Sequence, residues 1–299
     1  MHPVQRHASP GDITQLPFSR GHPIFYFHGL PGSRLEGALW HQPAADLGAK
    51  IIAIDRPGIG YSSPQSARTL LSFAQDIRDL AKQLDVSRYI IIGTSAGGPH
   101  ALACAHAHEP TALAAVALVA GLGPYEMVSS HAKLANRIVF WLFKHPWLAK
   151  PLGRISAAQF LRNPKLSDDE LLDAIEKKLD SSRFRLGRKL PEQDKQVVRD
   201  REIMRLVLAS ARQHFRQGMD GWAPDGKLLT EELGFRLDEL RVPMRLWYGR
   251  HDVNVPLSMG EELARRIGER AQLRVEDQGH VSILMNCREK VLRDLLSLA

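Results

Sequence analysis

A serine stands between two glycines in Gly93-Thr94-Ser95-Ala96-Gly97. The pentapeptide follows the apolar run Tyr89 to Ile92 and precedes Ala101 to Ala107, a helical stretch of small residues. A tight turn from strand to helix needs such small neighbours, because larger side chains would collide with either element, and it exposes the serine hydroxyl at the carboxyl edge of a sheet. Ser95 is therefore the candidate nucleophile.

A serine hydroxyl is a weak nucleophile at neutral pH, so it requires a general base and an acid that orients the base. Asp252 follows the apolar segment Leu246 to Tyr248, and His280 stands between the last predicted strand and the last predicted helix. Both positions lie at carboxyl ends of strands, so we expect them to meet Ser95. Asp277 is the competing acid, but its place three residues before His280 favours a role in the turn.

A tetrahedral intermediate also requires two donors for its oxyanion, normally backbone N–H groups. The residue after the nucleophile, Ala96, should supply one of them. The glycine-rich turn His28-Gly29-Leu30-Pro31-Gly32-Ser33 follows the first predicted strand and should supply the other, from Leu30. We expect His28 to shape this turn through hydrogen bonds rather than to act as a base.

Strands and helices alternate around these residues, which predicts an α/β fold with a mostly parallel sheet flanked by helices. Short apolar runs predict strands, and stretches with apolar residues at helical spacing predict helices. The predicted strands are 24–27, 50–54, 89–92, 114–120, 244–248 and 273–275, and the predicted helices are 71–84, 96–107, 258–267 and 281–298. The alternation stops between Leu122 and Leu240, where only helical patterns occur. We therefore expect a core of residues 1–121 and 241–299 and a helical cap inserted at 122–240.

Within the predicted cap, Ser167 and Glu170 fit a capping box, and Pro191 opens a helical pattern that could extend to Gly218. The stretch Ile138 to Leu148 is rich in aromatic and aliphatic residues. It either fastens the cap to the core, or forms the wall of an apolar substrate pocket or a lid that touches a membrane. As candidate pocket residues we name Phe140, Trp141, Phe143, Met219 and Trp222.

Composition excludes several classes of protein. The 299 residues carry a formal charge of +7, but Lys and Arg are scattered among Asp and Glu, so we expect no nucleic-acid partner. Cys104 and Cys287 lie far apart and predict neither a disulfide framework nor a thiolate metal site. The chemistry above needs no metal or organic cofactor. The absence of a signal sequence and of a long apolar run leads us to expect a cytoplasmic protein without stable membrane insertion.

Taken together, these motifs resemble the landmarks of the α/β-hydrolase superfamily. They are HGLPGS, Asp55-Arg56-Pro57-Gly58-Ile59-Gly60-Tyr61-Ser62, GTSAGG, GRHDVNVP and QGH, in that order. The resemblance implies a cap after the sixth strand, with Leu30 and Ala96 as oxyanion donors. HGxPG and DRPGxGxS are also similar to the proline-iminopeptidase-like branch, although Thr94 and Ala96 depart from the elbow of that branch. Epoxide hydrolases and haloalkane dehalogenases resemble this fold too, but they require an aspartate where Ser95 stands.

Members of this superfamily usually begin with two antiparallel strands, whereas only about twenty residues precede Ile24, and at best 13–18 form one irregular strand. The implied strand order then leaves 50–55 at or near an exposed sheet edge. Either a partner, such as a second copy in a homodimer, covers that edge, or further chain does.

The leading hypothesis is a serine hydrolase of the carboxylic-ester type, acting on an ester, thioester or lactone of an apolar small molecule. The same triad could instead support a carbon–carbon bond hydrolase or a lyase, since this fold hosts many chemistries. An aminopeptidase or a non-catalytic small-molecule receptor are further alternatives.

Overall fold

The computed structural model describes residues 21–132, 134–160, 167–180 and 190–299. Its centre is a parallel sheet of six strands in the order β2-β1-β3-β4-β5-β6. The strands are β1 (His22–Phe27), β2 (Ala49–Ile54), β3 (Tyr89–Thr94), β4 (Leu113–Val119), β5 (Met244–Gly249) and β6 (Ala271–Glu276). The α/β class is therefore confirmed, and all six predicted strands are present.

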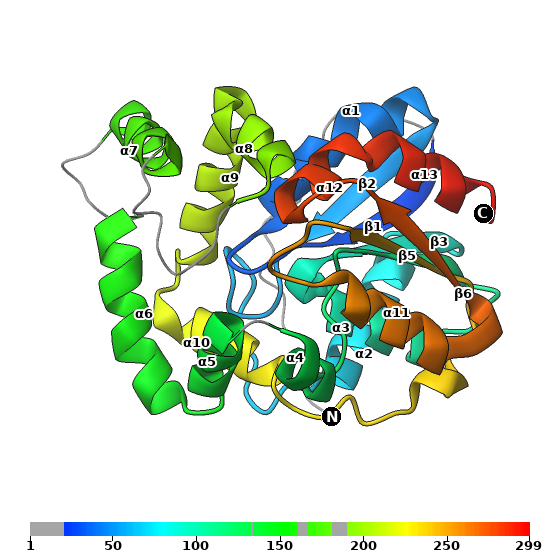
Figure 1. Ribbon diagram of the computed structural model, residues 1–299. Coiled ribbons are helices and arrows are strands. Elements are labelled where there is room, and N and C mark those ends of the chain that lie inside the picture. Colours follow the sequence, from blue (N-terminus) through cyan, green and yellow to red (C-terminus); the bar gives the residue numbers. More distant parts are fainter. Residues whose placement is uncertain (1–20, 133, 161–166, 181–189) are drawn as a thin grey trace.

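Helices cover both faces of the sheet (Figure 1). One face carries α2 (Leu70–Gln83), α3 (Gly98–Ala107) and α11 (Leu257–Ile267), and the other carries α1 (Ala38–Asp46), α12 (His280–Asn286) and α13 (Arg288–Leu296). Successive strand residues point to opposite faces, so Phe25 and Phe27 pack in one core while Ile24 and Tyr26 pack in the other. This double burial explains the nearly continuous apolar strands of the sequence. The two cysteines are buried in these cores as free thiols.

Between Leu122 and Leu240 the described residues form helices and no strand. They are α4 (Tyr125–His131), α5 (Leu134–Phe143), α6 (Pro146–Phe160), α7 (Asp168–Asp180), α8 (Glu192–Arg199), α9 (Arg201–His214) and α10 (Met219–Leu228). Figure 1 shows them beside the sheet's carboxyl edge. The boundaries at 121 and 241 stay predictions. No described helix has the length and apolar character that a bilayer crossing requires.

Two predicted helices are each divided in the structure. The pattern that opens at Pro191 forms α8 and α9, because the Asp200 side chain accepts hydrogen bonds from the N–H groups of Glu202 and Ile203 and so begins a new helix. The last predicted helix forms α12 and α13, with a break at Cys287. At α7 the predicted capping box is present, since Ser167 and Glu170 exchange hydrogen bonds.

The strand β2 lies at one edge of the described sheet, as the family resemblance implied for residues 50–55. Its only partner among the described strands is β1, with His22 opposite Ala49 and Phe27 opposite Ile54. The predicted irregular strand at 13–18 lies outside the described residues. What covers this edge stays a question for a homodimer or for further chain.

Candidate active site

The structure brings Ser95, His280 and Asp252 into one chain of hydrogen bonds. The Ser95 Oγ lies 3.2 Å from His280 Nε2, and His280 Nδ1 lies 2.7 Å from Asp252 Oδ2. The three side chains come from the carboxyl ends of β3, β5 and β6, where the parallel sheet delivers them to the same edge. This arrangement can make a hydroxyl nucleophilic, since the histidine accepts its proton and the carboxylate stabilises the resulting imidazolium.

A strained turn presents Ser95. Its φ is +48°, in the left-handed region that side chains with a Cβ rarely adopt. The glycines beside it are required by space, because a Cβ on Gly97 would lie 2.3 Å from the Phe27 carbonyl oxygen and one on Gly93 would lie 2.7 Å from the Ala101 methyl. The sequence argument for small neighbours at this turn thus has a direct steric basis.

The second oxygen of Asp252 fixes the carboxylate in place. Asp252 Oδ1 accepts hydrogen bonds from the N–H groups of Asn254 at 2.7 Å and Val255 at 2.8 Å. The alternative acid, Asp277, is exposed and binds the surface residue His251 at 2.6 Å instead. Its position at the surface matches the expected turn role, and it does not contact His280 through any described hydrogen bond.

Charges around His280 favour its protonated form. Burial alone would lower the pKa of His280, but the carboxylates of Asp252, Asp194 and Glu36 outweigh burial and raise it above the usual value. The imidazole must be neutral to accept the Ser95 proton, so activity should fall as the pH drops through this raised pKa.

The turn after β1 supplies the candidate oxyanion donors. The N–H of Leu30 donates to no acceptor in the described part of the chain, and that of Ala96 lies in the first turn of a helical segment, where it has no acceptor within the helix. Both residues line the same pocket as Ser95. His28 shapes the turn as expected, through Nδ1 at 2.8 Å from the Gly29 carbonyl oxygen, and burial lowers its pKa so that it is neutral.

Arg56 is a buried residue whose role the sequence did not reveal. Its guanidinium donates to the carbonyl oxygens of His28 at 2.5 Å and Gly29 at 3.1 Å, and so holds the oxyanion turn. It also pairs with Asp225 of α10 at 2.8 Å, with both side chains almost fully buried. Burial opposes the charge of Asp225, yet Arg56 and Arg68 hold the pKa of its carboxyl below the usual range. A buried ion pair therefore connects the insertion to the oxyanion turn.

Glu36 lies behind the same turn, and the sequence analysis did not identify it either. Its Oε2 accepts hydrogen bonds from the Gly29 N–H at 3.0 Å and from the Tyr26 hydroxyl at 3.2 Å. Burial raises the pKa of Glu36 to about 7, although these hydrogen bonds and the charges of Arg56 and His280 oppose the shift. Its carboxyl therefore changes charge in the neutral range, close to the base.

Asp194 of α8 is the third missed residue, and it binds the segment that carries the base. Its Oδ2 accepts from the His280 N–H at 3.0 Å, and its Oδ1 accepts from the N–H groups of Val281 at 3.1 Å and Ser282 at 2.8 Å and from the Ser282 hydroxyl at 2.7 Å. The carboxylate approaches so closely that a Cβ on Gly279 would lie 2.5 Å from it. Asp194 is thus a fully buried cap on the first turn of α12.

We expect Asp194→Asn to shift the acid limb of the pH profile of kcat/KM to lower pH. The Asp194 charge helps to raise the pKa of His280, so its removal leaves the base neutral at a lower pH. Asp194→Ala, which also removes the acceptors of α12, should lower kcat/KM about a hundredfold through misplacement of the imidazole. The control is Asp200→Asn, which removes a carboxylate charge at an exposed helix cap in the same insertion. An acid limb that does not move in Asp194→Asn would contradict this role.

A pocket of about 260 Å³ opens above Ser95. Its apolar wall consists of Leu122, Val139, Phe140, Phe143 and Val255, and its polar groups besides the triad are Asn136 and Asn254. The Asn136 side chain donates to the Asn254 carbonyl oxygen at 2.9 Å and so joins α5 to the turn that carries Asp252. This volume lies just below the range of roughly 300–1,000 Å³ usual for drug-sized ligands, so it suits a small acyl group.

Only some of the five candidate pocket residues of the insertion line the pocket in the structure. Phe140 and Phe143 line the pocket, whereas Trp141 is half exposed on the other side of α5. Met219 and Trp222 of α10 pack against Gly153 of α6, so they stabilise the insertion and do not line this pocket. Adjacent aromatic residues of α5 therefore face opposite ways.

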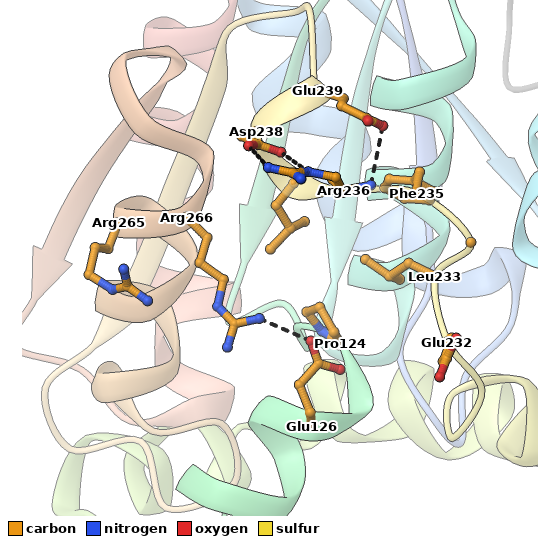
Figure 2. A pocket seen from close by; sticks show the side chains of 12 residues that line it. Pro124, Glu126, Glu232, Leu233, Phe235, Arg236, Asp238, Glu239, Arg265 and Arg266 are labelled. Atoms are coloured by element: carbon orange, nitrogen blue, oxygen red, sulfur yellow. Dashed lines mark hydrogen bonds and ion pairs between the residues drawn. The ribbon is translucent and has the colours of Figure 1, made fainter.

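A larger groove of about 970 Å³ lies between α4, α11 and the segment 232–239 (Figure 2). Its walls are charged, and two ion pairs lie among them: Arg266 with Glu126 at 3.0 Å and Arg236 with Asp238 at 2.5 Å. No residue of the Ser95 chain lines this groove. The candidate active site is therefore the smaller pocket.

Comparisons with known proteins agree with this fold. A family model described as the alpha/beta hydrolase fold matches residues 22–152. The solved esterase EaEST from Exiguobacterium antarcticum is 18% identical, with 94% of this chain and 92% of that chain covered and a TM-score of 0.63. These findings and the sheet order show that the chain has the α/β-hydrolase fold.

Curated relatives match only over part of their length. Protein ABHD8 of Homo sapiens is 26% identical over 278 residues, which is 90% of this chain and 53% of that protein. The non-heme chloroperoxidase CPO-A1 of Kitasatospora aureofaciens is 28% identical over 117 residues, 38% of this chain and 42% of that protein. This chain thus spans about half or less of the curated relatives that it matches.

Proposed function

We propose that the protein is a serine hydrolase of the carboxylic-ester type that acts on an ester, thioester or lactone with a small apolar acyl group. The observation that carries the proposal is the hydrogen-bonded chain from Ser95 through His280 to Asp252 at the base of an apolar pocket. The solved esterase with the same fold supports it. No metal or organic cofactor enters the proposed reaction.

The proposed reaction has two acyl transfers. Ser95 Oγ attacks the carbonyl carbon while its proton moves to His280 Nε2, and the Leu30 and Ala96 N–H groups stabilise the oxyanion. The bond to the leaving alcohol then breaks, and the alcohol takes the proton from His280. Water next attacks the acyl-serine and gives a proton to His280. The bond to Ser95 Oγ then breaks while His280 returns that proton to Ser95 Oγ, which releases the acid and restores the serine and the neutral base.

A series of p-nitrophenyl esters tests the proposal. We expect turnover of short acyl chains and declining kcat/KM once the chain outgrows the pocket of about 260 Å³. A 1,3-diketone assayed in parallel tests the alternative reaction, cleavage of a carbon–carbon bond. Turnover of the diketone without turnover of any ester would overturn the ester proposal, and so would the absence of both activities, which is the result expected of a receptor.

Phe140→Ala should raise KM for a butyrate ester about tenfold and leave an acetate ester nearly unchanged. The Phe140 ring lines the pocket but takes no part in the proposed proton transfers. Its burial against an acyl chain stabilises the bound substrate by about 1.5–3 kcal/mol. The matched control is Trp141→Ala on the next residue, which is half exposed and outside the pocket. Kinetic constants for both esters and the melting temperature of each variant are the measurements. An equal loss on both esters with a lowered melting temperature would show that Phe140 only holds the insertion together.

A further inference from the structure

The outer side of α5 and α6 carries an unusual concentration of exposed apolar side chains. Nine large hydrophobic residues are exposed in the described part of the chain, and seven of them belong to these two helices. They are Leu134, Ile138, Val139, Trp141, Trp147, Leu152 and Ile155, which we call the α5–α6 patch. Single exposed hydrophobic residues are normal, but a cluster of this size marks an interaction surface.

The patch follows from the helical spacing of the sequence. Leu134, Ile138 and Trp141 recur at the spacing of one helix face, while Phe140 and Phe143 occupy the inward side of α5. The helix is therefore apolar on two sides, one facing the pocket and one facing solvent. Figure 1 shows α6 at the left margin of the insertion, and α5 between α6 and α4.

Aromatic rings make the patch continuous between the two helices. The His145 ring lies 4.9 Å from that of Trp141 and 6.4 Å from that of Trp147. Trp147 is 72% exposed, which is high for a tryptophan. Amphipathic rings of this kind favour the interface between lipid headgroups and acyl chains.

The sequence around the patch carries positive charge. From Met127 to Ser167 the chain contains no Asp or Glu but seven Lys and Arg. Arg137 and Arg154 are exposed beside the patch, and no ion pair joins either of them to a described carboxylate. Lys144 lies over the Tyr125 ring at 4.0 Å, and among the described basic residues of this stretch Lys150 alone forms an ion pair, with Asp220 at 2.6 Å. The overall charge is scattered, but this surface is locally basic.

We propose that the α5–α6 patch docks the protein on the surface of an anionic lipid bilayer. Basic residues around exposed tryptophan and isoleucine are the chemistry that binds such a surface peripherally, with the apolar side chains entering the headgroup region. A second copy of the chain is disfavoured as the occupant, because two such faces would bring arginines of the same charge together.

The patch is also continuous with the mouth of the pocket. Val139 belongs to both, since it lines the pocket above Ser95 and is itself 46% exposed. A docked protein therefore presents its pocket next to the bilayer, where an amphiphilic ester would enter. This last step rests on the proposed hydrolase function, whereas docking itself does not.

Co-sedimentation of the full chain with lipid vesicles tests the docking. Wild type should sediment with vesicles of phosphatidylcholine mixed with phosphatidylglycerol, much less with phosphatidylcholine alone, and less in high salt. Arg137→Gln combined with Arg154→Gln should lower the partition coefficient about 25-fold, at about fivefold for each charge. Trp147→Ser combined with Ile155→Ser should lower it by at least about tenfold.

Two control variants carry the same kinds of change elsewhere. Arg88→Gln combined with Arg270→Gln removes two exposed charges far from the patch, and Val275→Ser removes an exposed apolar side chain of β6. Both should bind vesicles as wild type does. Every variant should keep its melting temperature and its turnover of a soluble acetate ester, because none of the changed residues lines the pocket.

Docking would be overturned if wild type failed to bind anionic vesicles, or if the patch variants bound as well as the controls. It would also be overturned if sedimentation velocity showed that wild type and the control variants are dimers while the patch variants are monomers. The occupant of the patch would then be a second copy. Ser95→Ala separates the two proposals: it should bind vesicles like wild type, so a failed hydrolase assignment leaves the vesicle result intact.

Discussion

Ser95→Ala is expected to abolish covalent labelling by a fluorophosphonate and to lower kcat for the ester roughly a million-fold. The reagent phosphonylates a serine only when a base has activated it, and Ser95 Oγ is the hydroxyl within 3.2 Å of His280 Nε2. Alanine keeps the Cβ and the turn but has no oxygen, so no acyl-enzyme can form. Residual hydrolysis would come only from binding and the oxyanion donors.

The matched control is Ser129→Ala, which removes a half-buried hydroxyl that donates to the Glu126 carbonyl oxygen within α4. Labelling and turnover should be retained there, and intact-protein mass spectrometry with peptide mapping would locate the label. Labelling that persists in Ser95→Ala would show that another residue is the nucleophile. An unlabelled but folded wild type would instead favour the receptor alternative.

The sequence was sufficient to predict that Ser95, Asp252 and His280 lie together, because chain geometry fixes their positions. Parallel strands all end at the same edge, so Ser95, Asp252 and His280 are brought together once each is recognised as the residue following a strand. The strand order that the α/β-hydrolase resemblance implies likewise predicted the edge position of residues 50–55. The inference about Ser95, Asp252 and His280 depends only on local patterns and on the regularity of a parallel sheet.

Asp194 and Arg56 could not be found in this way. The role of Asp194 depends on packing of α8 against α12, which joins residues 86 apart in the chain. In the sequence, Asp194 resembles any acidic residue near a helix start. Arg56 belongs to a landmark motif, but that motif does not indicate its contacts with the oxyanion turn and with Asp225. Their burial was the decisive signal, and burial of a charged residue cannot be deduced from its own neighbours.

The sequence also could not show which side of α5 faces the pocket and which side faces solvent. Hydrophobic periodicity locates the protein core only when one side of a helix is polar, and α5 has apolar residues on both sides. Trp141 and Phe140 are adjacent and similar in type, yet one faces solvent and the other faces the pocket. A similar limit applies to Asp200, which interrupts a continuous helical pattern because its side chain can cap a new helix.

Two buried carboxylates of the insertion bind the candidate machinery. Asp194 binds the turn that carries His280, and Asp225 binds Arg56, which holds the oxyanion turn. Both carboxylates are buried, so a shift of the insertion would leave charges or backbone donors without partners. We therefore expect the position of the insertion to influence both the base and the oxyanion donors, beyond its role as a pocket wall.

Asp252→Asn is expected to lower kcat about ten-thousandfold through the tautomer of His280. In the native protein Oδ1 accepts two backbone N–H groups, from Asn254 and Val255. An asparagine must keep its carbonyl oxygen at that position, because an amide NH₂ cannot accept these hydrogen bonds. Its NH₂ group then faces His280 Nδ1 and donates to it, so the imidazole proton is driven to Nε2. With a proton on Nε2, the histidine cannot accept the one on Ser95.

The comparison variant is Asp277→Asn, which changes only the exposed partner of His251 and should leave kcat unchanged. Equal melting temperatures for the two variants would exclude misfolding as the cause of the loss. The pH dependence gives a further check: without the Asp252 charge the pKa of His280 should fall, so any residual activity should persist to lower pH than in wild type. If Asp277→Asn were the damaging change and Asp252→Asn were active, the orienting acid would be Asp277, and the hydrogen bond of 2.7 Å between Asp252 and His280 would have no catalytic role.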